Sequence, residues 1–156
     1  MVELRREPAG SPASRDLFAE YMALIAERLG AGFEPTEDIF AGEDAFRGPG
    51  TAWLVGYEDD RAMCCGGMRT TETGVAELKR MFVSAPYRRH GHGRRLLREL
   101  VALAAAAAYQ RVRLLTTEAL TEARALYASA GYRVVETLRE GDRRDLWLEK
   151  ALVSAR

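Results

Sequence analysis

A basic, glycine-spaced loop at residues 86–95 separates an apolar segment from a helix-forming segment. Gly91 and Gly93 can adopt positive φ angles and let an anion approach the backbone. The amides of a first helical turn have no intrahelical partner, and the helix dipole favours negative charge there. Arginine forks suit phosphate oxygens, and the loop carries Arg88, Arg89, Arg94 and Arg95. This order of strand, loop and helix predicts a site for a phosphate-bearing ligand.

The same loop admits two other interpretations. His90 and His92 are separated by one glycine, a spacing found at some metal sites, but no cysteine or third histidine completes a ligand set. We therefore expect no metal and assign both histidines to phosphate contacts. The arginines could also contact nucleic acid. However, 23 basic and 23 acidic residues give a net charge of zero, which argues against a nucleic-acid partner.

The elements that position this loop follow from hydrophobic periodicity and from turn residues. We expect strands at residues 2–6, 51–57, 63–69, 75–83, 111–117, 132–138 and 145–152. We expect helices at residues 17–29, 35–46, 93–109 and 119–130. Ser14 or Asp16 would cap the first helix, Gly30 would end it, and Thr36 would cap the second. The order predicts an α/β fold with one parallel crossover in a mostly antiparallel sheet.

Composition indicates one globular domain over residues 1–156, with 47% apolar and 29% charged residues. The first residues contain no apolar h-region and no stretch is long enough to span a bilayer, so we expect a cytoplasmic protein without a membrane partner. Cys64 and Cys65 are adjacent and would face opposite sides of a strand. We interpret them as reduced core residues rather than metal ligands or a disulfide.

Two motifs resemble the GCN5-related N-acetyltransferase (GNAT) superfamily. Arg88-x-x-Gly91-x-Gly93 matches the Arg/Gln-x-x-Gly-x-Gly/Ala signature of the family and follows a strand, Glu77 to Val83, that resembles the family's fourth strand. The segment from Ala123 to Tyr132 resembles the second family motif, a helix that holds a tyrosine and ends in Gly-aromatic. The resemblance implies a mostly antiparallel sheet flanked by helices and splayed between the fourth and fifth strands.

The resemblance also implies that acetyl-CoA binds in that splay. The pyrophosphate would rest on backbone amides from Arg89 to Arg94, a stretch that includes His90, Gly91, His92 and Gly93. The pantetheine would pair with the backbone of Met81, Phe82 and Val83 as an added strand would. A β-bulge in the fourth strand would free backbone groups for this pairing.

Amide formation from a thioester needs a base and a group that stabilises the departing thiolate. Glu77, on the strand that leads to the loop, is our first candidate for the base. Glu118 is the alternative, and either side chain could instead form a surface ion pair, Glu77 with Lys79. Tyr127 occupies the family's tyrosine position and could donate its hydroxyl to sulfur, or could be an ordinary core residue. No nucleophile lies beside a histidine in sequence, which favours direct transfer in a ternary complex.

The acceptor is expected to be a primary amine of a small molecule, on chain length alone. A protein amine and a non-catalytic acyl-CoA-binding interaction module are the alternatives. A homodimer is consistent with the resemblance, because dimers are frequent in the family. An acidic stretch could steer a cationic acceptor or could be a solvated helix face, and it comprises Glu34, Glu37, Asp38, Glu43 and Asp44.

Overall fold

The computed structural model describes residues 2–30 and 42–152, and within them the strands form one seven-stranded sheet in the order β1-β2-β3-β4-β5-β7-β6. The strands are β1 (Val2–Arg6), β2 (Ala52–Glu58), β3 (Arg61–Glu72), β4 (Val75–Val83), β5 (Arg111–Thr117), β6 (Arg133–Glu140) and β7 (Arg143–Ala151). The helices are α1 (Pro12–Leu29), α3 (His92–Ala106) and α4 (Thr121–Ser129), with short 3₁₀ turns η1 (Glu43–Phe46) and η2 (Ala85–Tyr87).

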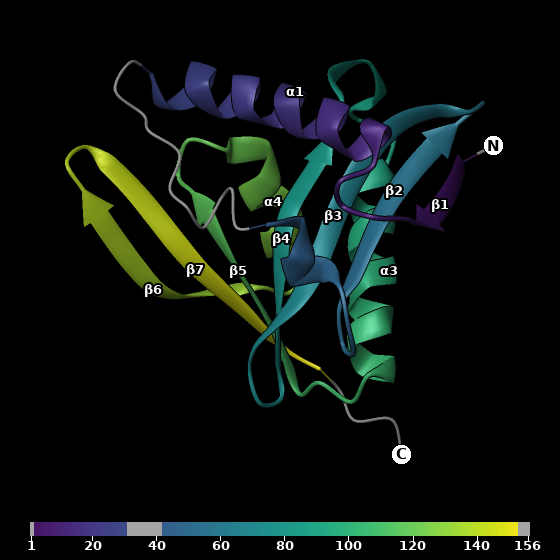
Figure 1. The fold of residues 1–156 in the computed structure, drawn as a ribbon. Coiled ribbons are helices and arrows are strands. Elements are labelled where there is room, and N and C mark those ends of the chain that lie inside the picture. The colour runs from purple at the N-terminus through teal and green to yellow at the C-terminus, as the bar shows by residue number, and fades with distance from the viewer. Residues whose placement is uncertain (1, 31–41, 153–156) are drawn as a thin grey trace.

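The sheet opens between β4 and β5, as the resemblance implied. These two strands form the parallel pair of the described sheet, and all other neighbours are antiparallel. Their pairing ends at Leu78 and Leu114, although β4 continues to Val83 and β5 to Thr117. In Figure 1 the two halves of the sheet meet at the lower end and diverge toward α1 and α4. Residues of both strands line a cavity at this divergence.

A β-bulge interrupts β4 where the strands begin to diverge. Cys65 pairs with Phe82 and Gly67 pairs with Lys79, so β4 has one more residue than β3 in this interval. Arg80 lies inside the bulge and adopts a φ of 57°. A bulge leaves backbone groups outside the ladder and bends the strand. The predicted bulge is therefore confirmed.

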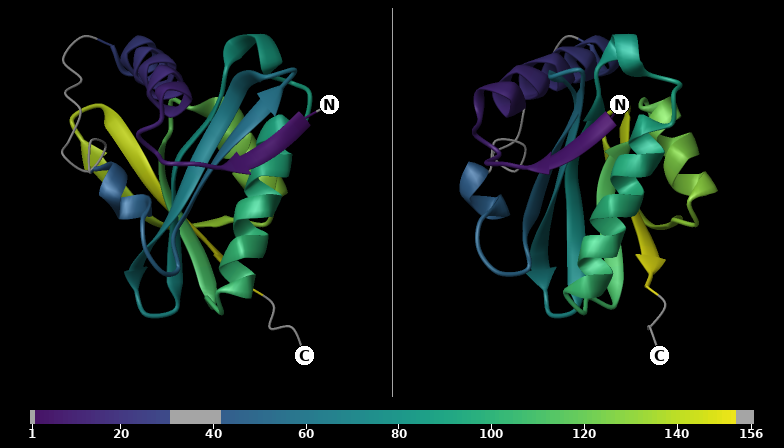
Figure 2. Two further views of the ribbon diagram at one scale, coloured as in Figure 1. Left: turned by 45° about the vertical axis from the view of Figure 1, so that its right-hand side comes forward. Right: turned by 90° about the vertical axis from the view of Figure 1, so that its right-hand side faces the viewer.

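Helices cover both faces of the central strands (Figure 2). The apolar stripe of α3 packs on one face, where Leu96, Leu100 and Ala104 are fully buried. The opposite face packs under α1 and η1, with Leu17, Phe46, Trp53 and Val55 in its core. The free, buried Cys64 and Cys65 lie in these two different cores, as their alternation predicted. None of the helices in the described part of the chain is long and apolar enough to cross a membrane.

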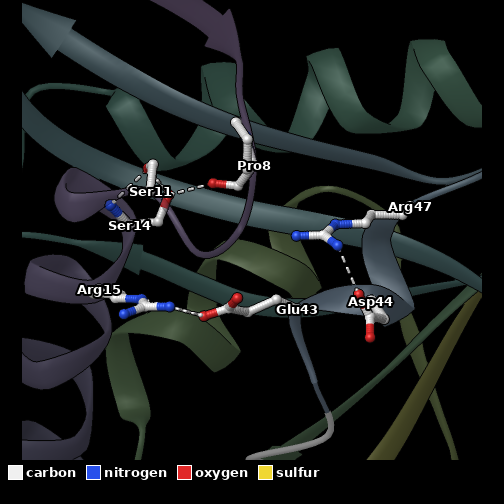
Figure 3. Close-up of polar contacts among 7 residues, drawn as sticks. All are labelled: Pro8, Ser11, Ser14, Arg15, Glu43, Asp44 and Arg47. Carbon is white, nitrogen blue, oxygen red and sulfur yellow. Dashed lines mark hydrogen bonds and ion pairs between the residues drawn. The ribbon is translucent and has the colours of Figure 1, made fainter.

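Helix α1 begins earlier than the sequence predicted. Its N-cap is Ser11, whose side chain accepts a hydrogen bond from the Ser14 amide at 3.2 Å, and Pro12 occupies the first helical position. Ser14 is buried and donates to the Pro8 carbonyl at 3.2 Å (Figure 3). It also accepts a hydrogen bond from Trp53 Nε1 at 2.9 Å. The assignment of Ser14 or Asp16 as the cap was therefore wrong, because a tertiary contact uses the Ser14 hydroxyl. Gly30 ends the helix as expected.

The second predicted helix, residues 35–46, lies largely outside the described residues, as does its proposed cap Thr36. Its last residues form the 3₁₀ turn η1. The third predicted helix begins one residue earlier, at His92, and ends three residues earlier, at Ala106. The turn at Gly141 and Asp142 joins β6 to β7 as predicted.

Candidate active site

A cavity of about 190 Å³ lies at the opening between β4 and β5. Side chains from α1, β4, β5, α4 and β7 line it, so that segments from residue 21 to residue 145 meet there. Glu77 and Tyr127, the two predicted catalytic residues, both line this cavity. Met81 lines it as well, and it lies beside the bulge of β4. The fold thus brings the proposed base, the proposed proton donor and the proposed pantetheine strand to one place.

Glu77 is buried, with only 4% of its surface exposed. Its Oε1 lies 3.0 Å from a terminal nitrogen of Arg69, 3.2 Å from Arg69 Nε and 3.4 Å from Lys79 Nζ. The ion pair with Lys79 that we considered from sequence therefore exists, but it lies inside the protein and Arg69 makes the closer contact. Cross-strand pairing explains this contact, because Arg69 lies directly opposite Glu77 on β3.

Tyr127 lies on α4 and is 6% exposed. Its ring contacts that of Tyr132 edge-on, with the centroids 5.8 Å apart. Burial raises the pKa of Tyr127 well above its ordinary value. The phenol therefore remains protonated at neutral pH. A protonated hydroxyl is required if Tyr127 is to donate a hydrogen bond.

Glu118, the alternative base, does not line the cavity. Its side chain is 46% exposed and its Oε2 lies 3.5 Å from Arg144 Nε. Its backbone amide donates to the Arg144 carbonyl at 2.9 Å. Glu118 therefore forms a surface ion pair, which was the alternative to a catalytic role that we considered from the sequence.

The glycines of the basic loop differ from each other in conformation. Gly91 is the N-cap of α3 with a φ of 82°, and a Cβ built on it would meet no atom within 4 Å. Gly93 lies inside the first turn and does not have a positive φ. A Cβ there would lie 3.3 Å from Leu126 and 3.6 Å from Val83, so Gly93 permits close packing of α3. Only Gly91 of the two uses the left-handed conformation that both could adopt.

Three of the four loop arginines are held by contacts within the chain. Arg88 Nε donates to the Val83 carbonyl at 2.9 Å, and Arg94 donates to Ser129 Oγ on α4 at 2.7 Å. Arg95 donates to the Val2 carbonyl at 3.0 Å, and Arg89 is exposed with a φ of 68°. These contacts hold positive charge around the start of α3 without neutralising it.

The two loop histidines lie close to each other, with ring centroids 6.0 Å apart. In the ranges 2–30 and 42–152 no group of three or more His, Cys, Asp or Glu side chains is arranged to hold a metal ion. His90 directly precedes Gly91, the N-cap of α3, and His92 is the first residue of that helix.

Two residues of the acidic stretch lie in the described part of the chain, and each has an arginine partner (Figure 3). Glu43 Oε1 lies 3.1 Å from Arg15, and Asp44 Oδ1 lies 2.9 Å from Arg47. Glu34, Glu37 and Asp38 lie outside the described residues. The prediction of an acidic wall therefore receives no support from Glu43 and Asp44, whose charges are paired.

Several residues that line the cavity carry no sequence signal of function. Asp145 and Arg143 enter it from β7, and Ile25 and Leu29 enter it from α1. No sequence motif surrounds these residues. Only the strand register, which places Asp145 opposite Thr117 at the open end of β5, could have indicated that Asp145 lies near the site. The contact of Arg69 with Glu77 could likewise not be predicted without the pairing of β3 with β4.

Comparison with known proteins agrees with this arrangement. Residues 15–132 match the acetyltransferase (GNAT) family. The uncharacterized N-acetyltransferase YsnE of Bacillus subtilis (strain 168) is 31% identical over 122 residues, which are 75% of this chain and 81% of that protein. The chain belongs to the acetyltransferase (GNAT) family, as the two motifs indicated. Its family places it among acyl-CoA-dependent acetyltransferases.

Solved structures share the fold over nearly the whole chain. A GNAT-family acetyltransferase from Staphylococcus aureus Mu50 superposes with a TM-score of 0.79 at 14% identity, over 98% of this chain and 100% of that one. A GNAT-family acetyltransferase from Elizabethkingia anophelis, solved with acetyl-CoA bound, gives 0.72 at 17% identity, over 97% and 98%. These likenesses confirm the expected mixed sheet with its parallel β4–β5 pair.

Proposed function

We propose that this protein transfers the acetyl group of acetyl-CoA to the primary amine of a small molecule, by direct attack within a ternary complex. One observation carries the proposal: a buried carboxylate, Glu77, and a buried phenol, Tyr127, line the same cavity at the opening of the sheet. The cavity volume of about 190 Å³ is large enough to admit a small amine.

The described residues fit acetyl-CoA as co-substrate. Beyond Leu78, no strand of residues 2–30 and 42–152 pairs with β4 on its β5 side, so the backbone of Met81, Phe82 and Val83 can pair with the pantetheine amides. The backbone amides from Arg89 to Arg94, with Gly91 at the helix N-terminus, would hold the pyrophosphate. When bound, the co-substrate supplies the activated acetyl group.

Glu77 would accept the proton that the amine loses on attack, directly or through a water molecule. The amine nitrogen forms a bond to the thioester carbon, and the bond from that carbon to sulfur breaks. Tyr127 would donate its hydroxyl hydrogen bond to the departing sulfur. Its raised pKa keeps that hydrogen in place until the sulfur becomes negative.

An acetylation assay with a panel of amines tests the proposal. Release of free CoA thiol should accelerate with at least one small primary amine, and the product should carry one acetyl group by mass spectrometry. Binding of CoA without turnover of any amine would favour the non-catalytic acyl-CoA-binding module instead. Turnover only with peptides would favour the protein amine.

Substitution of Gly91 by valine tests the phosphate loop. A β-branched side chain at a φ of 82° is strained, and it would fill the open space that the loop backbone presents. We expect the Kd for CoA, measured by calorimetry, to rise about tenfold or more, which corresponds to about 1.4 kcal/mol.

Gly141→Val is the matched control for this change, since Gly141 also has a positive φ, of 61°, and open space around it but lies in the β6–β7 turn. CoA affinity should be unchanged in this control. Equal affinity in wild type and Gly91→Val would contradict the assignment of the loop to the pyrophosphate.

A further inference from the structure

We propose that Asp145 on β7 binds the ammonium group of the acceptor, and so selects alkylamines with one positive charge and an apolar body. The inference rests on the proposed function and names the substrate class of the same cavity. Asp145 lines that cavity together with Glu77 and Tyr127, although it lies far from both in sequence.

The physical requirement comes from the charge of the acceptor. An alkylamine has a pKa of roughly 10, so it reaches the site as a cation and releases one proton to solvent before its nitrogen attacks. Much of the cavity wall is apolar, with Ile25, Leu29 and Leu120 among its residues. Moving a cation from water to such a wall is unfavourable unless a carboxylate receives it. The lining must therefore supply an anion.

Two carboxylates line the cavity in the described residues, and they differ in their partners. Oε1 of Glu77 is shared by Arg69 and Lys79. Lys79 and Arg80 also line the β4 side of the cavity, so a cationic acceptor meets positive charge there. The β4 side is for this reason a poor place for an ammonium group to bind first.

On the β7 side the cavity lining holds one charge of each sign, Arg143 and Asp145. Asp145 Oδ2 lies 3.3 Å from Arg143 Nε, and its side chain is 20% exposed. Arg143 makes a shorter contact, 2.6 Å, with Oε2 of Glu140. Two carboxylates thus surround one guanidinium in this group, and Asp145 is the one of the two that lines the cavity. Arg143 lies closer to Glu140 than to Asp145, whereas Glu77 has two cations beside it. Asp145 is therefore the less tightly paired of the two cavity carboxylates, and the one that an ammonium can approach.

Apolar residues of the cavity lining can contact the part of the acceptor that carries no charge. Leu115, two residues before Thr117 on β5, lines the cavity and is 42% exposed, a high value for a leucine. Leu29 and Ile25 of α1 face the same space. An apolar body that covers these side chains would remove them from water, which favours binding through the hydrophobic effect. The lining therefore fits an arylalkylamine or a longer alkylamine better than a polyhydroxylated one.

The test compares Asp145→Asn with wild type in steady-state acetylation of 2-phenylethylamine, a cation at pH 7, and of aniline, which is neutral. The KM for 2-phenylethylamine should rise about tenfold or more, the fold-change expected from loss of a charge-assisted contact. The KM for aniline and the KM for acetyl-CoA should change less than twofold. Asp142→Asn, the same change at an exposed position of the β6–β7 turn, should alter none of these values.

The outcomes separate the inference from the proposed function. If wild type acetylates 2-phenylethylamine and Asp145→Asn does so with unchanged KM, the inference is overturned and the proposed function stands. An equal rise for aniline also overturns it, because the effect would then be one of cavity shape. If wild type acetylates no amine, the proposed function fails first.

A second measurement uses the wild-type protein alone, in case Asp145→Asn does not fold. The permanent cation 2-phenylethyltrimethylammonium cannot be acetylated and should inhibit competitively against the amine. It should inhibit at least about ten times more strongly than its neutral carbon isostere, (3,3-dimethylbutyl)benzene. Equal inhibition by the two compounds would overturn the role of Asp145.

Discussion

Replacement of Tyr127 by phenylalanine is expected to lower kcat about a hundredfold or more, with the affinity for CoA changed less than twofold. The substitution removes one oxygen atom and keeps the ring that contacts Tyr132 in the core. Stability should therefore hardly change. A positioned proton donor contributes about 10²- to 10⁴-fold to a rate, which sets the size of the expected loss.

Stopped-flow measurement of thiol release under single-turnover conditions, beside calorimetric CoA titration, separates the two quantities for Tyr127. Tyr132→Phe is the matched control, since Tyr132 is also a buried tyrosine of this core but does not line the cavity. Its kcat should remain close to that of wild type. Loss of CoA affinity in parallel with kcat in Tyr127→Phe would make Tyr127 a structural residue.

Replacement of Glu77 by glutamine is expected to have two separable effects. The first is a loss of kcat of about a hundredfold, because an amide cannot accept the proton of the amine. The second is a loss of stability of about 3 kcal/mol, because removing the charge of Glu77 breaks a largely buried ion-pair group that includes Arg69 and Lys79.

Urea denaturation measures the free energy of unfolding of Glu77→Gln, and kinetics at saturating concentrations of both substrates measure kcat. Glu118→Gln is the control and should show neither effect, because Glu118 is exposed and outside the cavity. A destabilised Glu77→Gln protein with the kcat of wild type would show that Glu77 only holds the two cations, and that another group or water accepts the proton.

Structural features that depend only on residues close together in the sequence were predicted well. The strand 75–83 and the strand 111–117 have the bounds that periodicity indicated, and the turn at Gly141 and Asp142 is present. The start of α1 was missed because Ser11, Ser14 and Asp16 are all good caps, and the choice among them depends on Trp53, 39 residues after Ser14. A hydrogen bond between distant residues leaves no signal in the local pattern.

The sequence by itself determined the order of strand, glycine-containing loop and helix on which the proposed phosphate site depends, because these elements follow one another along the chain. It also determined the family, because both motifs are local. Only the tertiary structure decided which carboxylates share the cavity. Glu77, Tyr127 and Asp145 come from three separate elements, and they meet because β4 and β5 stop pairing at Leu78 and Leu114. Convergence of this kind depends on strand order and register, which no single stretch of residues encodes.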